Sequence, residues 1–253
     1  MENLNELITL ADKGDLKAII DIAQYYVDNN KMVDALDWWK RAYHLGHISS
    51  ITVICHIQKL CAIAVIDMAG LKSAEDELKE LYQWTKLQQK HLKNGEISIK
   101  EDSSVLEFAS YKLATIYYSQ NNYKQVFSLS DDLNLSLRSQ LLLGNTYFKN
   151  ELYSAAYNLL AKLENNSTYA QKIKEIKDRD DYEIFSYCVA THYLAGIYRI
   201  GLPSIHISSD LNKSHSILSF ALPYVSDSAY SEVITEELAK FQKKLFGGYK
   251  YIG

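Results

Sequence analysis

An internal repeat limits the folds that are open to this chain. The segment LATIYYSQNNYKQVFSL, which begins at Leu113, aligns without a gap to LGNTYFKNELYSAAYNL, which begins at Leu143. Small, aromatic and aliphatic residues recur in the same order at an offset of 30 residues (143 − 113). Repeats of about this length are typical of stacked helix pairs. One such pair cannot bury its own apolar face, so successive copies are expected to pack on one another.

Two further copies follow the same frame. The first begins at Ile22 and has Ala23 and Ala35 at its two small positions. The last begins at Tyr193 and carries an insertion, LPSIHISSD, between its two helices. A small residue on each helix lets the pair cross closely, and an aromatic ring one turn further along covers the seam. The clear copies of the repeat cover residues 11–46, 105–133, 139–163 and 190–222.

The scarcity of proline supports long helices. The chain has two prolines, Pro203 and Pro223, and both lie near its C-terminal end. Proline breaks the interior of a helix, whereas an all-β chain of this length would use proline and glycine in many turns. We therefore predict an all-α fold, an α-solenoid of antiparallel helix hairpins with about 12–14 helices. We expect a single domain over residues 1–253, with a possible seam in the loop at 94–103.

The longest apolar stretch, residues 48–70, also reads as a helix. It contains His56, Lys59 and Asp67, polar groups that a membrane-spanning helix rarely tolerates. We predict a core helix that is buried on most sides.

Residues 229–253 are expected to form a C-terminal cap or tail. Gly247-Gly248 is predicted to end the last helix. The residues that follow, Tyr249, Tyr251 and Ile252, have two interpretations. They either dock a partner as an exposed peptide or fold back to cap the last hairpin. Capping is favoured because terminal repeats of a solenoid need it.

The repeated residues resemble the tetratricopeptide repeat, and the first and last copies resemble its Sel1-like variant. In the first copy, the Sel1-like order runs through Ala11, Gly14, Ala18, Ala23, Tyr26, Ala35, Trp39, Arg41, Ala42 and Gly46. The first three copies lack the glycine that follows the first helix of a Sel1-like repeat. The resemblance implies a right-handed superhelix whose concave face, lined by the first helices, holds an extended or helical peptide.

Charge and cysteine content narrow the class of protein. The formal net charge is −4, so no basic surplus is present to neutralise phosphates, and we expect no nucleic-acid partner. No signal peptide is recognisable in MENLNELITLADKGD, and no basic segment beside an apolar one suggests a membrane surface. The three cysteines, Cys55, Cys61 and Cys188, do not suggest a disulfide framework. We expect a cytoplasmic protein, with Cys55 and Cys61 as small core residues.

Two residue pairs have spacings that chemistry could use. Cys188 and His192 are four residues apart on an expected helix, which is compatible with a nucleophile and its base. No orienting group or oxyanion site accompanies them, so packing of Cys188 in the core is the favoured interpretation. His44 and His47 lie three apart at a helix end, but structural zinc sites use four ligands. We expect no catalytic activity, no metal and no cofactor, and a groove enzyme around Cys188 and His192 is the less favoured alternative.

The leading interpretation is therefore a protein-interaction module, an adaptor or scaffold that binds a protein or peptide partner. A narrower alternative, implied by the Sel1-like resemblance, is a bacterial immunity or effector-partner protein. Arg138, Asn145 and Lys149 offer contacts for a carboxylate, and Tyr118 and Phe148 offer rings for apolar side chains or for packing between hairpins. The residues predicted on or near the concave face are Lys17, Gln24, Tyr111, Thr115, Tyr118, Arg138, Asn145, Phe148, Lys149, His192 and Arg199.

Overall fold

The fold is known from a computed structural model, which describes residues 4–98, 103–134, 136–178, 181–244 and 247–253. The chain divides into two compact units, Met1–Ile116 and Tyr117–Gly253, which are treated separately below. Within the described residues there are thirteen α-helices and one pair of short strands. The expected all-α architecture of helix hairpins is confirmed. The possible seam at 94–103 includes residues 99–102, which lie outside the described ones.

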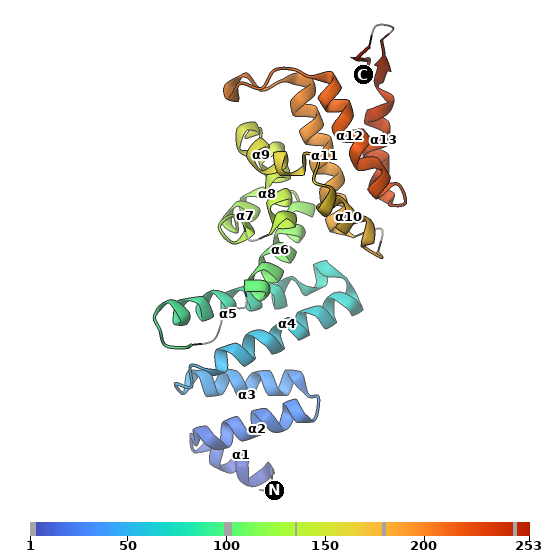
Figure 1. Cartoon of the computed structure of the whole chain (residues 1–253). Helices are drawn as coiled ribbons and strands as arrows, with labels where there is room; N and C mark the ends of the chain where they lie inside the picture. The colour runs from blue at the N-terminus through green and yellow to red at the C-terminus, as the bar shows by residue number, and fades with distance from the viewer. Residues whose placement is uncertain (1–3, 99–102, 135, 179–180, 245–246) are drawn as a thin grey trace. The chain divides into compact units, whose positions relative to one another are not determined.

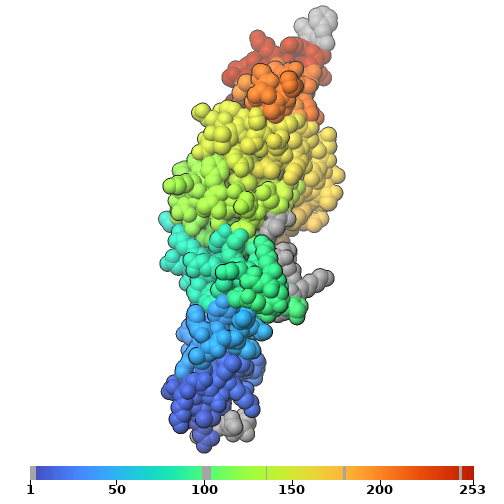
Figure 2. Space-filling model, turned by 90° about the vertical axis from the view of Figure 1, so that its left-hand side faces the viewer, coloured from blue at the N-terminus to red at the C-terminus, as the bar shows by residue number. Residues whose placement is uncertain are grey.

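Unit 1 is a row of helices in which each packs against the next in the chain. Figure 1 shows the first five of them in blue to teal, running alternately in opposite directions, and Figure 2 shows their surfaces following one another in chain order. Most of α6 also belongs to this unit. The elements are α1 (Leu4–Asp12), α2 (Leu16–Asp28), α3 (Met32–His44), α4 (Ser50–Ala69), the 3-10 turn Leu71–Ala74, α5 (Glu75–Lys93) and α6 (Ser103–Ser119).

The small residues of the first repeat lie where its helices cross. Ala23 on α2 and Ala35 on α3 are fully buried, and they share a core cluster with Leu36, Trp39 and Ile54. An alanine at a crossing allows the backbones of two helices to approach closely, which brings the surrounding larger side chains into contact. Both small positions of the predicted frame are therefore buried in this hairpin.

Unit 2 is also helical, and it ends in a small antiparallel sheet of β1 and β2. The helices α8, α9, α11 and α12 form two hairpins, and α8 packs directly on α11. Of the other helices, α7 packs on α8, α10 packs on α11 and α12, and α13 packs on α11 and α12. The elements are α7 (Tyr123–Ser128), α8 (Leu137–Lys149), α9 (Tyr153–Leu160), α10 (Ser167–Glu175), α11 (Tyr182–Ile200), α12 (Leu211–Val225), α13 (Glu232–Ala239), β1 (Phe241–Lys243), β2 (Tyr249–Tyr251) and 3-10 turns at Asp132–Asn134, Ala161–Leu163, Pro203–Ile205 and Ala229–Ser231.

The last repeat shows why small residues recur. Ser214 on α12 is buried against α11, and its hydroxyl donates a hydrogen bond to the carbonyl oxygen of Ala195 at 2.8 Å. Ala195, Leu218 and Ala221 are buried beside it. The two small residues therefore face each other across the crossing, as the repeat frame predicts.

A left-handed turn residue replaces the missing glycine in the first three copies. Asn30, Asn121 and Glu151 have φ values of 57°, 56° and 62° and follow α2, α6 and α8. Asn121 and Glu151 are 30 residues apart, and Asn30 occupies the same position of its copy. The fourth copy uses Gly201, with φ of 85°. A residue of positive φ thus follows the first helix in all four copies, but in the fourth it directly follows α11 and its ψ of 161° gives a different turn.

Gly144 on α8 is required by the close approach of α9. A Cβ atom at this position would lie 2.7 Å from Cδ2 of Leu160 and 3.3 Å from Cβ of Leu159. Leu160 is itself fully buried, so it has little room to move. We expect Gly144→Val to lower the free energy of unfolding by about 2–3 kcal/mol through overpacking. Urea denaturation followed by far-ultraviolet circular dichroism measures this.

The control for this substitution is another glycine in a helix. Gly196 on α11 has no atom within 4 Å of the position that a Cβ would take. Gly196→Ala is expected to leave stability unchanged or to raise it by up to about 1 kcal/mol, because alanine is the better helix former. Equal destabilisation by both substitutions would contradict the importance of the α8–α9 contact.

The helix α4 departs from its prediction. By length and composition alone, α4 could span a membrane, and the core helix of a folded protein can pass the same test. Only 33% of its most apolar 18 residues are buried, however. The first half contacts α3 and α5 through residues such as Ile54 and Ile57, whereas Leu60, Ala64 and Met68 in the second half are exposed. Burial on most sides is therefore wrong, because its described neighbours cover one face only. Cys61 is accordingly half-buried, not a core residue, while Cys55 is in the core.

The C-terminal tail folds back on unit 2. The last helix ends at Ala239, so the prediction that it continues to Gly247-Gly248 is wrong. Residues 241–243 and 249–251 instead pair as antiparallel strands. The ring of Tyr249 stacks on His215 of α12 with 3.7 Å between centroids, and the Tyr251 hydroxyl donates to the Glu237 carboxylate at 2.9 Å. These contacts favour the capping interpretation of the tail.

Candidate functional site

An aromatic groove in unit 2 is the candidate site. It has a volume of about 350 Å³ and is formed by the end of α6, the start of α7, the end of α8 and one face of α11. Concave sites with an apolar lining and a few polar groups are the usual binding sites of proteins. We call this the aromatic groove, and it is lined by Tyr118, Ser119, Asn121, Tyr123, Lys149, Tyr182, Phe185, Val189 and Tyr193.

One wall of the aromatic groove is a stacked pair of rings. Phe148 and Tyr193 are parallel within 9°, with 4.1 Å between their centroids. The ammonium group of Lys149 lies 6.0 Å from the centroid of the Tyr193 ring. Stacking fixes the orientation of Tyr193, and Lys149 adds a positive charge at the mouth of an otherwise neutral site. The wall therefore offers an apolar face and a cation together.

The other rings of the aromatic groove contact one another in tilted and edge-to-face arrangements. The ring centroid of Tyr118 lies 5.8 Å from that of Tyr123 and 6.4 Å from that of Phe185. The centroids of Phe185 and Tyr182 are 5.6 Å apart. Burial, and after it the neighbouring phenol of Tyr193, raises the pKa of Tyr118 well above its usual value. Tyr118 is therefore a neutral hydrogen-bonding group at any physiological pH. Rings held by one another in this way lose little entropy when a ligand binds.

Three of the residues predicted from the sequence thus meet at one place. Tyr118 and Lys149 line the aromatic groove, and Phe148 forms its wall from behind. Phe148 also lines a second cavity of about 230 Å³, which lies at the C-terminal end of α11 beside Gly201.

Two of the predicted residues are engaged by other groups of the chain. The buried amide of Asn145 donates hydrogen bonds to the carbonyl oxygen and the hydroxyl of Ser186, at 3.0 and 3.2 Å. Arg138 lies 3.9 Å from the carboxylate of Glu183, which is buried and also receives a hydrogen bond from Lys172 at 2.9 Å. Both therefore join α8 to α11, and neither lines the aromatic groove.

His192 and Arg199 lie near Glu237 of α13. Nε of Arg199 is 3.5 Å from the Glu237 carboxylate, and its guanidinium carbon is 4.2 Å from the centroid of the Tyr251 ring. Burial lowers the pKa of His192, which leaves its imidazole neutral at pH 7. These two residues belong to the packing of the C-terminal tail.

The remaining four predicted residues belong to unit 1. Lys17 and Gln24 are exposed on α2, where Gln24 donates a hydrogen bond to Asp28 at 2.8 Å. Tyr111 and Thr115 are buried in α6, and the Thr115 hydroxyl donates to the Tyr111 carbonyl oxygen at 2.9 Å. The burial of Tyr111 and Thr115 places them in the packing of the unit and not on an open surface.

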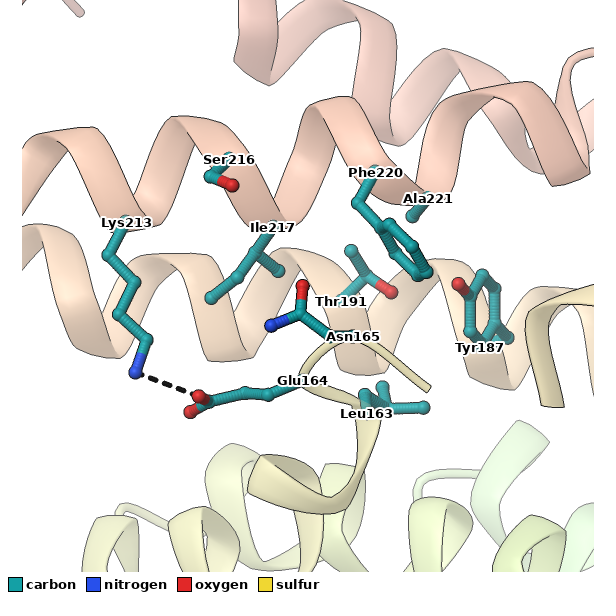
Figure 3. Close-up of a pocket in the computed structure, with 10 residues that line it drawn as sticks. All are labelled: Leu163, Glu164, Asn165, Tyr187, Thr191, Lys213, Ser216, Ile217, Phe220 and Ala221. Atoms are coloured by element: carbon teal, nitrogen blue, oxygen red, sulfur yellow. Dashed lines mark ion pairs between the residues drawn. The ribbon is translucent and has the colours of Figure 1, made fainter. Parts of the chain in front are cut away.

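A smaller cavity lies between α11, α12 and the turn after α9, as Figure 3 shows. Its volume of about 50 Å³ has room for roughly one or two water molecules. Lys213 forms an ion pair with the Glu164 carboxylate, with 2.7 Å between Nζ and the oxygen. Figure 3 draws this pair as a dashed line. Lys213 also donates to the Tyr198 hydroxyl, which in turn donates to Glu164. This polar cluster joins α12 to the preceding repeat, and it leaves no room for an organic ligand.

The residues of the enzyme alternative are not arranged for chemistry. Cys188 is fully buried in the core cluster of unit 2, as the packing interpretation predicts. A nucleophile has to be accessible to its substrate.

His47, one of the two histidines with a metal-ligand spacing, lies in unit 1, and its Nδ1 is 2.7 Å from the Ser50 hydroxyl. No cluster of three or more potential metal ligands occurs among the residues that the structure describes.

Sequence reasoning missed the contribution of α11 to the aromatic groove. Tyr182, Phe185, Val189 and Tyr193 follow one another at spacings of three and four residues, so they share one face of the helix. This spacing was a detectable signal. It could not show that the face meets the end of α6, because that contact joins residues far apart in the chain.

No family model matches the chain, and no curated protein matches it either. One similar solved structure is that of c5321, a protective antigen present in uropathogenic Escherichia coli strains and displaying an SLR fold. The two chains share 16% sequence identity, and their structures align with a TM-score of 0.31. The match covers 94% of this chain and 56% of the antigen, so the chain spans little more than half the antigen's length. The fold described above rests on this chain's own helices.

Proposed function

We propose that the chain is a non-catalytic protein-interaction module, an adaptor of the Sel1-like repeat type that acts in the cytoplasm. The observation that carries the proposal is the aromatic groove, in which five rings and one lysine line a cavity large enough for two or three side chains of a peptide. Aromatic residues are the commonest anchors of protein interfaces because they supply a large contact area at a low entropy cost.

The chemistry of the groove indicates the kind of partner. Its lining combines phenol hydroxyls, ring faces and the ammonium group of Lys149. A phenol can donate a hydrogen bond to a peptide carbonyl oxygen or accept one from a peptide N–H group. The rings pack against aliphatic or proline side chains. A carboxylate of the partner would be placed favourably next to Lys149. We therefore expect a peptide with apolar side chains and an acidic residue.

A display selection of random peptides against the folded chain tests this function. We expect enriched peptides to bind with micromolar affinity, and fluorescence anisotropy of a labelled peptide measures it. Phe148→Ala with Tyr193→Ala removes the stacked wall and should weaken binding by about 30-fold to 700-fold, because two anchor residues at about 1–2 kcal/mol each are lost. Lys149→Glu should weaken an acidic peptide selectively.

The matched control is Tyr25→Ala, which removes an exposed ring from α2. It should leave the affinity unchanged. The proposal is wrong if the double variant keeps its circular dichroism spectrum and still binds the selected peptides as tightly as the wild type does.

A further inference from the structure

A second groove, in unit 1, is apolar and acidic at its edge. Its volume is about 670 Å³, and it lies among α3, the second half of α4 and the first half of α5. We call it the unit 1 groove. It is lined by Asn30, Met32, Val33, Leu36, Asp37, Lys40, Gln58, Leu60, Cys61, Ala64, Val65, Met68, Glu77 and Glu80.

Two apolar stripes form the walls of the unit 1 groove. On α4, Leu60, Ala64 and Met68 are spaced four residues apart and therefore lie along one line of the helix. On α3, Val33 and Leu36 form the facing stripe. Val33 is 68% exposed and Met68 is 80% exposed, so these side chains are not covered within the described residues. Two antiparallel helices with facing stripes of this spacing offer the valley into which a third helix packs.

The charged groups at the edge are predominantly acidic. Asp37, Glu77 and Glu80 line the groove together with a single cation, Lys40. Lys40 is neutralised by Glu80, with 2.5 Å between Nζ and the carboxylate. Among the described residues, Asp37 and Glu77 form no ion pair. The groove therefore retains about two uncompensated negative charges beside its apolar walls, which complement a cationic ligand.

The floor of the unit 1 groove contains an unsatisfied polar group. Gln58 is 2% exposed, and its amide nitrogen donates to the Glu77 carbonyl oxygen at 3.5 Å. Its amide oxygen has no hydrogen-bond partner among the described residues. A buried acceptor without a donor is unfavourable by about 1–3 kcal/mol.

From these observations we propose that the unit 1 groove binds a basic amphipathic helix of a partner protein. Its apolar residues, at spacings of three and four, pack on the α3 and α4 stripes. Its lysine or arginine side chains pair with Asp37 and Glu77. The site is separate from the aromatic groove and goes beyond the function proposed for it.

A synthetic helical peptide of about 16 residues, with leucines on one face and lysines elsewhere, is the probe. We expect the full-length protein to bind it with micromolar affinity by fluorescence anisotropy. Binding should also slow the alkylation of Cys61, which lines the groove, whereas Cys55 and Cys188 are buried. A peptide with glutamate in place of lysine, and a scrambled peptide of identical composition, should bind at least about tenfold more weakly.

Three variants separate the contributions of shape and charge. Ala64→Trp fills the groove from an exposed position and should abolish binding and the protection of Cys61. Asp37→Lys with Glu77→Lys should weaken binding at least about tenfold and flatten its dependence on salt. Leu10→Glu changes an exposed leucine of α1 and should have no effect. Phe148→Ala with Tyr193→Ala should also leave this binding intact, which distinguishes it from the aromatic groove.

Several outcomes overturn the proposal. Equal binding of the lysine and glutamate peptides would mean that the acidic edge plays no part. Unchanged binding by a correctly folded Ala64→Trp variant would place the peptide elsewhere. Concentration-dependent self-association that Ala64→Trp prevents would assign the groove to a second copy of the chain. Binding of the protein to phosphatidylcholine vesicles, lost in Met68→Glu, would assign the exposed half of α4 to a membrane.

Discussion

Replacing Ala23 by arginine is expected to unfold unit 1. Ala23 is fully buried where α2 crosses α3, and its cluster contains Trp39 and Ile54. An arginine cannot fit into the crossing without separating the helices, and its charge would have no buried partner. The loss is expected to be about 3–5 kcal/mol, a large part of the roughly 5–15 kcal/mol that stabilises a typical domain.

Tryptophan fluorescence isolates this effect. The three tryptophans, Trp38, Trp39 and Trp84, all belong to unit 1. A urea titration followed by their emission therefore reports on unit 1 alone. Gln24→Arg, at the exposed neighbouring position, is the control and should shift the midpoint little. An unchanged midpoint for Ala23→Arg would show that the repeat frame has been placed on the wrong residues.

Replacing Glu237 by glutamine is expected to release the C-terminal strands. Glu237 is buried, with 3% of its surface exposed. Its carboxylate accepts hydrogen bonds from Lys240 and Tyr251, both at 2.9 Å. Arg199 lies 3.5 Å away. Glutamine keeps the shape of the side chain but lacks the negative charge that pairs with Lys240 and Arg199. We expect trypsin to cleave at Lys243 and Lys244 about tenfold faster, since charge-assisted hydrogen bonds are lost.

Acid should have the same effect on the wild type. Burial alone would raise the pKa of Glu237, but hydrogen bonds from Lys240 and Tyr251 outweigh it and hold the pKa below the usual 4.5. A lowered carboxyl pKa in the folded state stabilises the fold above the unfolded pKa, and this contribution is lost as the pH falls through the folded pKa.

The pH at which the strands loosen should therefore lie below about 4.5 in the wild type. Hydrogen exchange of residues 249–252 at several pH values measures it. Glu237→Gln should show fast exchange already at pH 7 and no further change in this window. Parallel pH curves for the two proteins would rule out Glu237 as the group responsible.

The fold could be predicted from the sequence where packing leaves a local trace. A close helix crossing needs small residues, so Ala23, Ala35 and Ser214 recur in register, and all three are buried as predicted. The exposed half of α4 left no such trace. The sequence shows that Leu60 and Met68 are apolar, but it does not show which neighbour is available to cover them. The strands at the C-terminus were missed because three residues are too few to establish an alternating pattern.

The candidate site was predicted only in part, for a similar reason. Tyr118, Phe148 and Lys149 stand at the ends of first helices, and the structure brings them together at the aromatic groove. Arg138 and Asn145 were predicted on the same side, but their partners, Glu183 and Ser186, come from a later helix. Repeat position indicates the direction of a side chain; it does not reveal which distant group will engage it.

The exposure of Met68 links the unit 1 groove to oxidising conditions. Hydrogen peroxide converts an accessible methionine thioether to the sulfoxide, which is polar and strongly hydrated. At the end of the α4 stripe, a sulfoxide would turn part of an apolar wall into a polar one without disturbing the buried core. Enzymatic reduction of the sulfoxide would then restore the original surface, so the hydrophobic character of this face depends on the redox history of the protein.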